Sequence, residues 1–112
     1  MPMIHLTVAD PKKNAPVVLA EASRIVAAAT GKPESYVMAF LDGAEFLMRG
    51  KSVPSAFVEV RGIGGVSKSV NAEISKNICA LLQKQQGIPA ENVYLNFIDV
   101  PGQNWGTCNG TF

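Results

Sequence analysis

The sequence has little cysteine, little histidine and little charge. Its 112 residues include two cysteines and one histidine, and charged residues make up 17% of the chain. Cys79 and Cys108 lie far apart and form no Cys-x-x-Cys pair, and His5 is the one histidine that could join them as a ligand. Metal sites need several such ligands at short spacing. We therefore expect two free thiols and no metal site.

Long apolar runs and an excess of one charge are also missing. No stretch reaches the roughly 18 apolar residues of a membrane span, and the N-terminus lacks the basic and apolar segments of a signal peptide. The formal charge is +1 and the basic residues are scattered, which speaks against a polyanionic partner. We expect a cytoplasmic protein that binds neither nucleic acid nor membrane.

What is present is a half-chain repeat in a chain of single-domain length. Apolar residues make up 47% of the chain, enough for one globular core over residues 1–112. The segment GKPESYVMAFLD from Gly31 resembles GIPAENVYLNFID from Gly87, with Gly, Pro and Val at the same spacing. Each segment follows a helical pattern, which itself follows a strand pattern. The chain therefore reads as two strand–helix–strand units, at about 1–55 and 56–112.

Apolar residues at helical spacing predict one helix between Asn14 and Gly31 and another between Ser67 and Gly87. The side chains of Asn14 and Ser67 are expected to cap the helix starts, and the two glycines to end the helices. Alternating patterns predict strands at 3–8, 36–41, 56–61 and 93–98, with short additional strands near 46–49 and around Trp105.

These elements predict an α+β fold, a two-layer sandwich built from two pseudo-symmetric βαβ units. Right-handed crossovers place both helices on one face of a four-stranded mixed sheet. The other face is apolar too, because the run YVMAFL is apolar on both sides and Met3, Tyr94 and Ile98 point away from the helices. Nothing in the chain covers that face. We therefore expect identical subunits to cover it in a homo-oligomer.

The glycine-rich segment RGIGGVSKS, at 61–69, lies between a predicted strand and a predicted helix. A phosphate-binding loop of the form G-x-x-x-x-G-K-[ST] would need a second glycine where Ser67 stands. Two other uses stay open. The segment can form a tight turn with positive φ angles, or its backbone N–H groups, such as that of Ile63, can bind a carboxylate or an enolate oxygen.

The Met-Pro start has two interpretations. Pro2 can simply be a rigid beginning for the first strand. Alternatively, a small second residue permits removal of Met1, which leaves Pro2 with a free secondary amine. An ordinary α-amine has a pKa near about 8, and both burial and a nearby Lys32 would lower it. Such an amine would be a base near neutral pH, whereas Lys32 alone is typical of a solvated residue beyond a helix end.

Two further positions carry polar groups on predicted strands. Tyr94 and Asn96 are two residues apart and so share a strand face, where they could belong to a subunit contact or to a pocket. His5 shares a face with Met3 and Thr7, and a lone histidine there gives no reason to assign it a role.

Several collinear motifs together resemble the macrophage migration inhibitory factor family of the tautomerase superfamily. They are the MPM start, ATGKPESYV at 29–37, GIGGV at 62–66, NVYLNFIDV at 92–100 and the closing NGTF. The resemblance implies a homotrimer with active sites between subunits, and a keto–enol tautomerase that acts on arylpyruvates such as phenylpyruvate without a cofactor. The implied roles are Pro2 as catalytic base, Lys32 and the Ile63 backbone as substrate-binding groups, Asn96 and Tyr94 contributed by the adjacent subunit, and Tyr36, Trp105 and Phe112 as an aromatic rim.

The chain departs from the family pattern at two places. Ser55 and Val58 stand where some members carry a Cys-x-x-Cys, so the thiol–disulfide activity of those members is not expected here. Thr107 stands where vertebrate members place a tryptophan, which reshapes the expected pocket mouth.

A retained Met1 would acylate the Pro2 amine and abolish its basicity. The alternative function, by family analogy alone, is a cytokine-like protein ligand with a protein receptor, non-classical secretion and a vestigial pocket.

Overall fold

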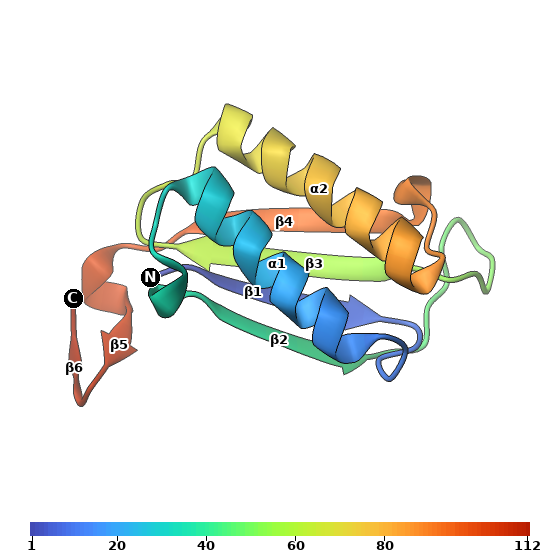
Figure 1. Cartoon of the computed structure of the whole chain (residues 1–112), viewed down its shortest axis with the longest axis horizontal. Coiled ribbons are helices and arrows are strands. Elements are labelled where there is room, and N and C mark those ends of the chain that lie inside the picture. Colours follow the sequence, from blue (N-terminus) through green and yellow to red (C-terminus); the bar gives the residue numbers. More distant parts are fainter.

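The computed structural model describes all 112 residues, which form a four-stranded sheet with two helices on one face (Figure 1). The main elements are β1 (Met3–Val8), α1 (Ala15–Thr30), β2 (Met38–Gly43), β3 (Ala56–Gly62), α2 (Lys68–Gln86) and β4 (Val93–Asp99). The strand order is β2-β1-β3-β4. β1 runs parallel to β2 and β3 parallel to β4, whereas β1 and β3 are antiparallel. The predicted α+β sandwich with a mixed sheet is confirmed.

Each half of the chain makes one βαβ unit. β1, α1 and β2 form the first unit and β3, α2 and β4 the second, and the two central strands β1 and β3 join them. A parallel pair needs a crossover, and here each crossover is a helix. Both helices lie side by side on the same face of the sheet (Figure 1). The opposite face carries no element of the chain.

The core lies between the helices and the sheet. Burial alternates along β1, where Ile4, Leu6 and Val8 are fully buried, because successive strand residues point to opposite faces. Each helix has one apolar side, and these sides pack on the apolar face of the sheet to form one core layer. The buried apolar cluster consists of Ile4, Leu6, Val8, Val18, Ala22, Val26, Ala56, Val58, Val60, Ile74, Ile78, Leu81, Leu82, Ile88 and Val93.

Three of the four predicted helix ends are confirmed. The Ser67 hydroxyl accepts a hydrogen bond from the Val70 N–H at the start of α2, and Gly31 and Gly87 end the helices with left-handed φ angles of 71° and 68°. The predicted cap at Asn14 is wrong. Asn14 is itself left-handed, and its side-chain amide donates to the Gln85 carbonyl instead, which ties the two helices together. Neither helix is long and apolar enough to cross a membrane.

The smaller elements differ from the sequence prediction. β2 begins at Met38 rather than at 36, because a 3₁₀ turn, η1 (Glu34–Tyr36), follows Pro33. No strand forms at 46–49, where Arg49 and Gly50 have positive φ and close a tight turn. Further 3₁₀ turns are η2 (Ala90–Asn92) and η3 (Gly102–Asn104), and the expected strand near Trp105 is a hairpin of β5 (Gly106–Thr107) and β6 (Gly110–Thr111).

The sheet face opposite the helices is open and partly apolar, as the sequence predicts. Met38 and Tyr94 on the two edge strands are 65% and 64% exposed, and Phe40 of β2 and Phe57 of β3 are exposed as well. Large apolar side chains gathered on one face of a sheet usually mark an interaction surface.

Candidate active site

The N-terminal amine lies beside Lys32 at one end of the molecule. The N-terminus, the β3–α2 loop and the β5–β6 hairpin all lie at this end (Figure 1). Desolvation lowers the pKa of the Met1 amine below 8.0, and the positive charge of Lys32 lowers it further. A lowered amine pKa increases the neutral fraction near pH 7, and the neutral form can accept a proton. These are the two causes expected above for a free amine at Pro2.

Pro2 itself is fully buried at the head of β1. Its carbonyl accepts a hydrogen bond from the Met38 N–H at 3.1 Å, which joins the chain start to β2. Its Cα lies 3.9 Å from the point where a Cβ on Gly62 would stand, so β3 packs closely against it. While Met1 is attached, the Pro2 nitrogen belongs to a peptide bond and is not basic. Amine chemistry at Pro2 therefore requires the loss of Met1.

Lys32 follows directly after the glycine that ends α1 and reaches into the β3–α2 loop. Its Nζ donates hydrogen bonds to the carbonyl oxygens of Ile63 and Gly64. The loop turns there because Gly64 and Gly65 adopt φ angles of 69° and 74°, which residues with side chains rarely adopt. A Cβ at Gly65 would also stand 3.4 Å from the Lys32 side chain. The two glycines are therefore needed for the turn of the loop, whose carbonyls hold the ammonium group.

A pocket of about 730 Å³ opens next to the N-terminus, a size typical of small-molecule sites. The lining residues are Met1, Ser35, Tyr36, Ile63, Thr107, Cys108 and Phe112. The structure therefore brings the N-terminus, Ile63 and two of the three expected rim aromatics to one pocket. Trp105 lies outside it and lines a smaller pocket of about 270 Å³ with Met3 and Arg61.

The C-terminal hairpin forms one wall of the 730 Å³ pocket. Cys108 and Asn109 have φ angles of 49° and 66°, and two positive φ angles are the signature of the type I′ hairpin turn. The Phe112 N–H donates to the Trp105 carbonyl at 3.1 Å, which folds the chain end back. The resemblance implies Phe112 in the rim and Thr107 at the pocket mouth, but it assigns no role to Cys108, which the hairpin turn brings into the pocket.

Tyr94 and Asn96 do not reach this pocket within one chain. They lie on β4 opposite Phe57 and Glu59 of β3, and both are exposed on the open sheet face. Neither of them lines the 730 Å³ pocket. If they contact substrate, they do so from another subunit.

Asp99 is a site residue that sequence reasoning missed. It is the last residue of β4, and its Oδ1 accepts a hydrogen bond from the Gly64 N–H at 2.9 Å. This contact also bears on the phosphate-loop hypothesis, since a phosphate loop offers its amides to the anion. Here one loop amide is bound to a carboxylate, and the loop carbonyls hold Lys32. The arrangement disfavours phosphate binding.

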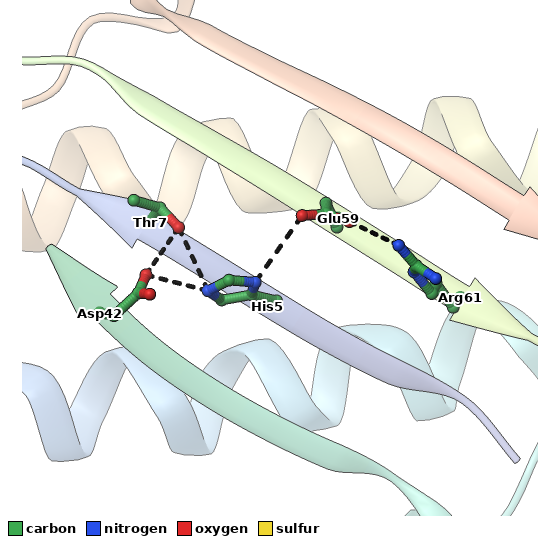
Figure 2. Close-up of polar contacts among 5 residues, drawn as sticks. All are labelled: His5, Thr7, Asp42, Glu59 and Arg61. Carbon is green, nitrogen blue, oxygen red and sulfur yellow. Dashed lines mark hydrogen bonds and ion pairs between the residues drawn. The ribbon is translucent and has the colours of Figure 1, made fainter. Parts of the chain in front are cut away.

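A polar cluster occupies the middle of the open sheet face (Figure 2). His5 Nε2 lies 2.9 Å from Asp42 Oδ1, the Thr7 hydroxyl donates to the same oxygen at 2.6 Å, and His5 Nδ1 lies 3.8 Å from Glu59 Oε1. Hydrogen bonds from Thr7 and then His5 lower the pKa of Asp42 below 3.8. The His5 ring also stacks on Phe40, with centroids 4.2 Å apart. No role for His5 is expected from the sequence, because its charged partners come from two other strands.

The fold is a two-layer pair of βαβ units with the N-terminal amine beside a pocket. The family model for macrophage migration inhibitory factor (MIF) matches residues 1–112, so the chain belongs to that family. It is 32% identical over 114 residues to the macrophage migration inhibitory factor homolog of Trichuris trichiura, with 100% of both chains covered. It is 31% identical to the rat macrophage migration inhibitory factor, over 100% of this chain and 99% of the relative.

Solved structures of the family have the same fold. The macrophage migration inhibitory factor-like protein of Entamoeba histolytica has a TM-score of 0.94 and 31% identity, and covers 99% of this chain and 98% of its own. The homologue from Prochlorococcus marinus has a TM-score of 0.92 and 35% identity, with 98% of each chain covered. A fused 4-OT, described as a symmetric trimer, shares the fold alone at 19% identity and a TM-score of 0.84.

Proposed function

We propose that the protein is a keto–enol tautomerase that acts on arylpyruvates, with the amine of Pro2 as the general base once Met1 is removed. The observation that carries this proposal is the Met1 amine, one residue before Pro2: it lies beside a mostly apolar pocket, and desolvation and Lys32 lower its pKa. We expect the same two causes to act on the Pro2 amine once Met1 is gone. A base of this kind has its neutral form available near pH 7. Family membership adds to the argument.

The proposed reaction moves one proton without a cofactor. The neutral Pro2 nitrogen takes a proton from the carbon next to the ketone, and the electron pair of that C–H bond moves into the carbonyl to form an enolate. The proton then goes to the enolate oxygen, which gives the enol and returns the amine to its neutral form. Donors fixed in place stabilise the negative oxygen as it forms. The Lys32 ammonium and the Ile63 N–H are the groups we assign to the substrate oxygens.

The aromatic part of the substrate would lie against the rings that line the pocket. Tyr36 and Phe112 are 55% and 51% exposed, so both can change their apolar contacts when a ligand enters. Offset or edge-on packing of aromatic rings adds to the energy of area burial. This favours an arylpyruvate over a small aliphatic keto acid.

We further propose a homotrimer in which the open sheet faces of three chains meet. The support is the apolar surface around Phe40, Phe57 and Tyr94, which no element of the chain covers. Assembly through this face would remove it from water. It would also let Tyr94 and Asn96 of one chain reach the pocket of the next.

The test combines intact mass with an enol–keto assay on phenylpyruvate. A general base contributes about 100- to 10,000-fold to rate, so Pro2→Gly should reduce kcat/KM steeply in protein whose mass shows that Met1 is gone. Protein that retains Met1 has no free Pro2 amine and keeps the Met1 side chain in the pocket lining, so it should be inactive. Wild-type rates in Pro2→Gly, or full activity with Met1 attached, would remove Pro2 from the mechanism.

A further inference from the structure

The end of β4 holds the glycine loop at two points. The Val100 N–H donates to the Gly62 carbonyl at 2.8 Å, and Asp99 Oδ1 accepts from the Gly64 N–H at 2.9 Å. The first contact continues the parallel pairing of β3 with β4, in which Gly62 lies opposite Asp99. The second uses a side chain and lies beyond the end of the ladder. It fixes the part of the loop that ordinary sheet pairing would leave free.

The same loop atoms hold Lys32. The carbonyls of Ile63 and Gly64 accept from the Lys32 ammonium, and Gly64 is the residue whose N–H is bound by Asp99. One peptide segment therefore joins a carboxylate from the second βαβ unit to an ammonium from the first. The ammonium in turn lies close enough to the N-terminal amine to lower the pKa of that amine.

We propose that Asp99 is a positioning residue of the tautomerase site: it fixes the Gly62–Gly65 loop so that the loop carbonyls direct the Lys32 ammonium toward the N-terminal amine and the substrate. This inference rests on the proposed function, because it assigns Asp99 a part in the same site. Asp99 does not line the pocket, so it acts through the loop and not on the substrate.

The charge of Asp99 argues for this role. A carboxylate near a site for anionic keto acids repels the substrate, and near the amine it favours the protonated form, so its charge works against both proposed tasks. Its useful contribution is then the hydrogen bond and not the charge. The N-terminal amine lies among four ionisable side chains that line the pocket or bind the loop, namely Lys32, Asp99, Tyr36 and Cys108. Of these, Lys32 is the one positive side chain that the loop orients.

Two substitutions separate the hydrogen bond from the charge. Asp99→Asn keeps an oxygen that can accept from Gly64 and removes the charge, whereas Asp99→Ala removes both. Misplacement of a site by about 1 Å can cost on the order of 100-fold, so we expect Asp99→Ala to lose about 10- to 100-fold in kcat/KM for phenylpyruvate. Asp99→Asn should stay close to wild type. Asp10→Ala is the matched control, because Asp10 is an exposed aspartate remote from the loop.

The pH dependence gives a readout that a merely structural role would not move. In Asp99→Ala the amine should titrate at higher pH, since Lys32 is no longer held beside it, while in Asp99→Asn the titration should stay or move slightly lower. In a Lys32→Met background, Asp99→Ala should cause no further upward change, as expected for residues that act through one another. Equal effects of Asn and Ala, or an unchanged amine titration in Asp99→Ala, would overturn the proposal.

A measurement without substrate keeps the two proposals distinguishable. NMR titration of the N-terminal amine and hydrogen exchange of the Gly64 amide report the loop directly. Faster Gly64 exchange in Asp99→Ala, together with the upward amine titration, supports the positioning role even where phenylpyruvate is not turned over, and in that case only the proposed function fails. Unchanged exchange and titration contradict the positioning role whatever the activity. Far-UV circular dichroism and thermal unfolding confirm that each variant is folded.

Discussion

The Lys32 ammonium is held by the backbone carbonyl of Ile63 and forms no ion pair with a carboxylate. A carbonyl orients the ammonium through its dipole but does not neutralise the charge. The net positive charge therefore stays available to act on the N-terminal amine and on an anionic ligand. An ion pair at the same place would have cancelled much of that effect.

Replacing Lys32 with Met should raise the pKa of the N-terminal amine, because one of the causes that lower it disappears. The base is active when neutral, so the acid limb of the kcat/KM profile should move to higher pH, and turnover at pH 7 should fall. Lys32→Arg keeps the charge and should move the limb less. Steady-state kinetics from pH 5 to 9 checks this prediction, and coincident acid limbs in the Met and wild-type proteins would contradict it.

In protein that retains Met1, the Met1 amine also links stability to pH. Its pKa in the folded protein lies below the 8.0 of an unperturbed terminus, so the unfolded chain binds the proton more readily. The free energy of unfolding from this group is therefore fully present above about pH 8 and is lost as the pH falls through the folded-state pKa. Denaturant titrations of wild type and Lys32→Met across this range should show a weaker pH dependence in the variant.

The main elements could be predicted because local rules agree with the tertiary structure. In α2, Ser67 caps the start, Gly87 ends the helix, and Ile74 and Ile78 lie on the buried side. Strand patterns of period two and helix patterns of period 3.6 each leave one apolar face, and burying both faces together nearly determines a two-layer fold. The helix-cap prediction failed at Asn14, because its side-chain amide binds the carbonyl of the distant Gln85 instead of the start of α1.

The candidate site was only partly predictable for a related reason. Pro2, Lys32 and Ile63 belong to motifs that the sequence displays. In the sequence, Asp99 is simply an acidic residue at the end of an apolar strand. Its contact with the Gly64 N–H arises only from the pairing of β4 with β3. Cys108 lines the pocket because the C-terminal hairpin folds back toward the chain start. Its positive φ could not be predicted, because cysteine is not a residue typical of that conformation.

Thiol reagents should distinguish the two cysteines. Cys108 is exposed and lines the pocket, whereas Cys79 is partly buried in the helix layer, and desolvation raises the pKa of its thiol. The thiolate is the reactive form, so iodoacetamide near pH 7.5 should modify Cys108 first and block phenylpyruvate turnover. Cys79→Ser should stay sensitive to the reagent and Cys108→Ser should lose that sensitivity. Peptide mass mapping identifies the labelled residue, and first labelling at Cys79 would contradict the assignment.

A charge on the open sheet face should disrupt the assembly. Met38 is 65% exposed in the single chain, so Met38→Glu leaves the monomer fold intact but places a carboxylate in the proposed subunit contact. We expect smaller particles in sedimentation velocity and a loss of activity, because Tyr94 and Asn96 would no longer reach a neighbouring pocket. Val17→Glu is the matched control, since Val17 is 46% exposed on the helix side. A wild-type monomer at low micromolar concentration would end the trimer proposal.

The polar cluster in the same face predicts a second pH effect. The Thr7 hydroxyl donates to Asp42 and is the largest cause that lowers the pKa of that carboxyl. Thr7→Val should therefore raise the pKa of Asp42, while Thr7→Ser keeps the hydroxyl and should preserve it. Since the folded-state pKa lies below 3.8, this interaction contributes stability above about pH 4 that is lost as the pH falls through the folded value. The carboxyl carbon shift of Asp42, followed by NMR from pH 2 to 6, measures the change directly. Identical titration curves for the Val and Ser variants would show that the hydroxyl does not hold the carboxylate.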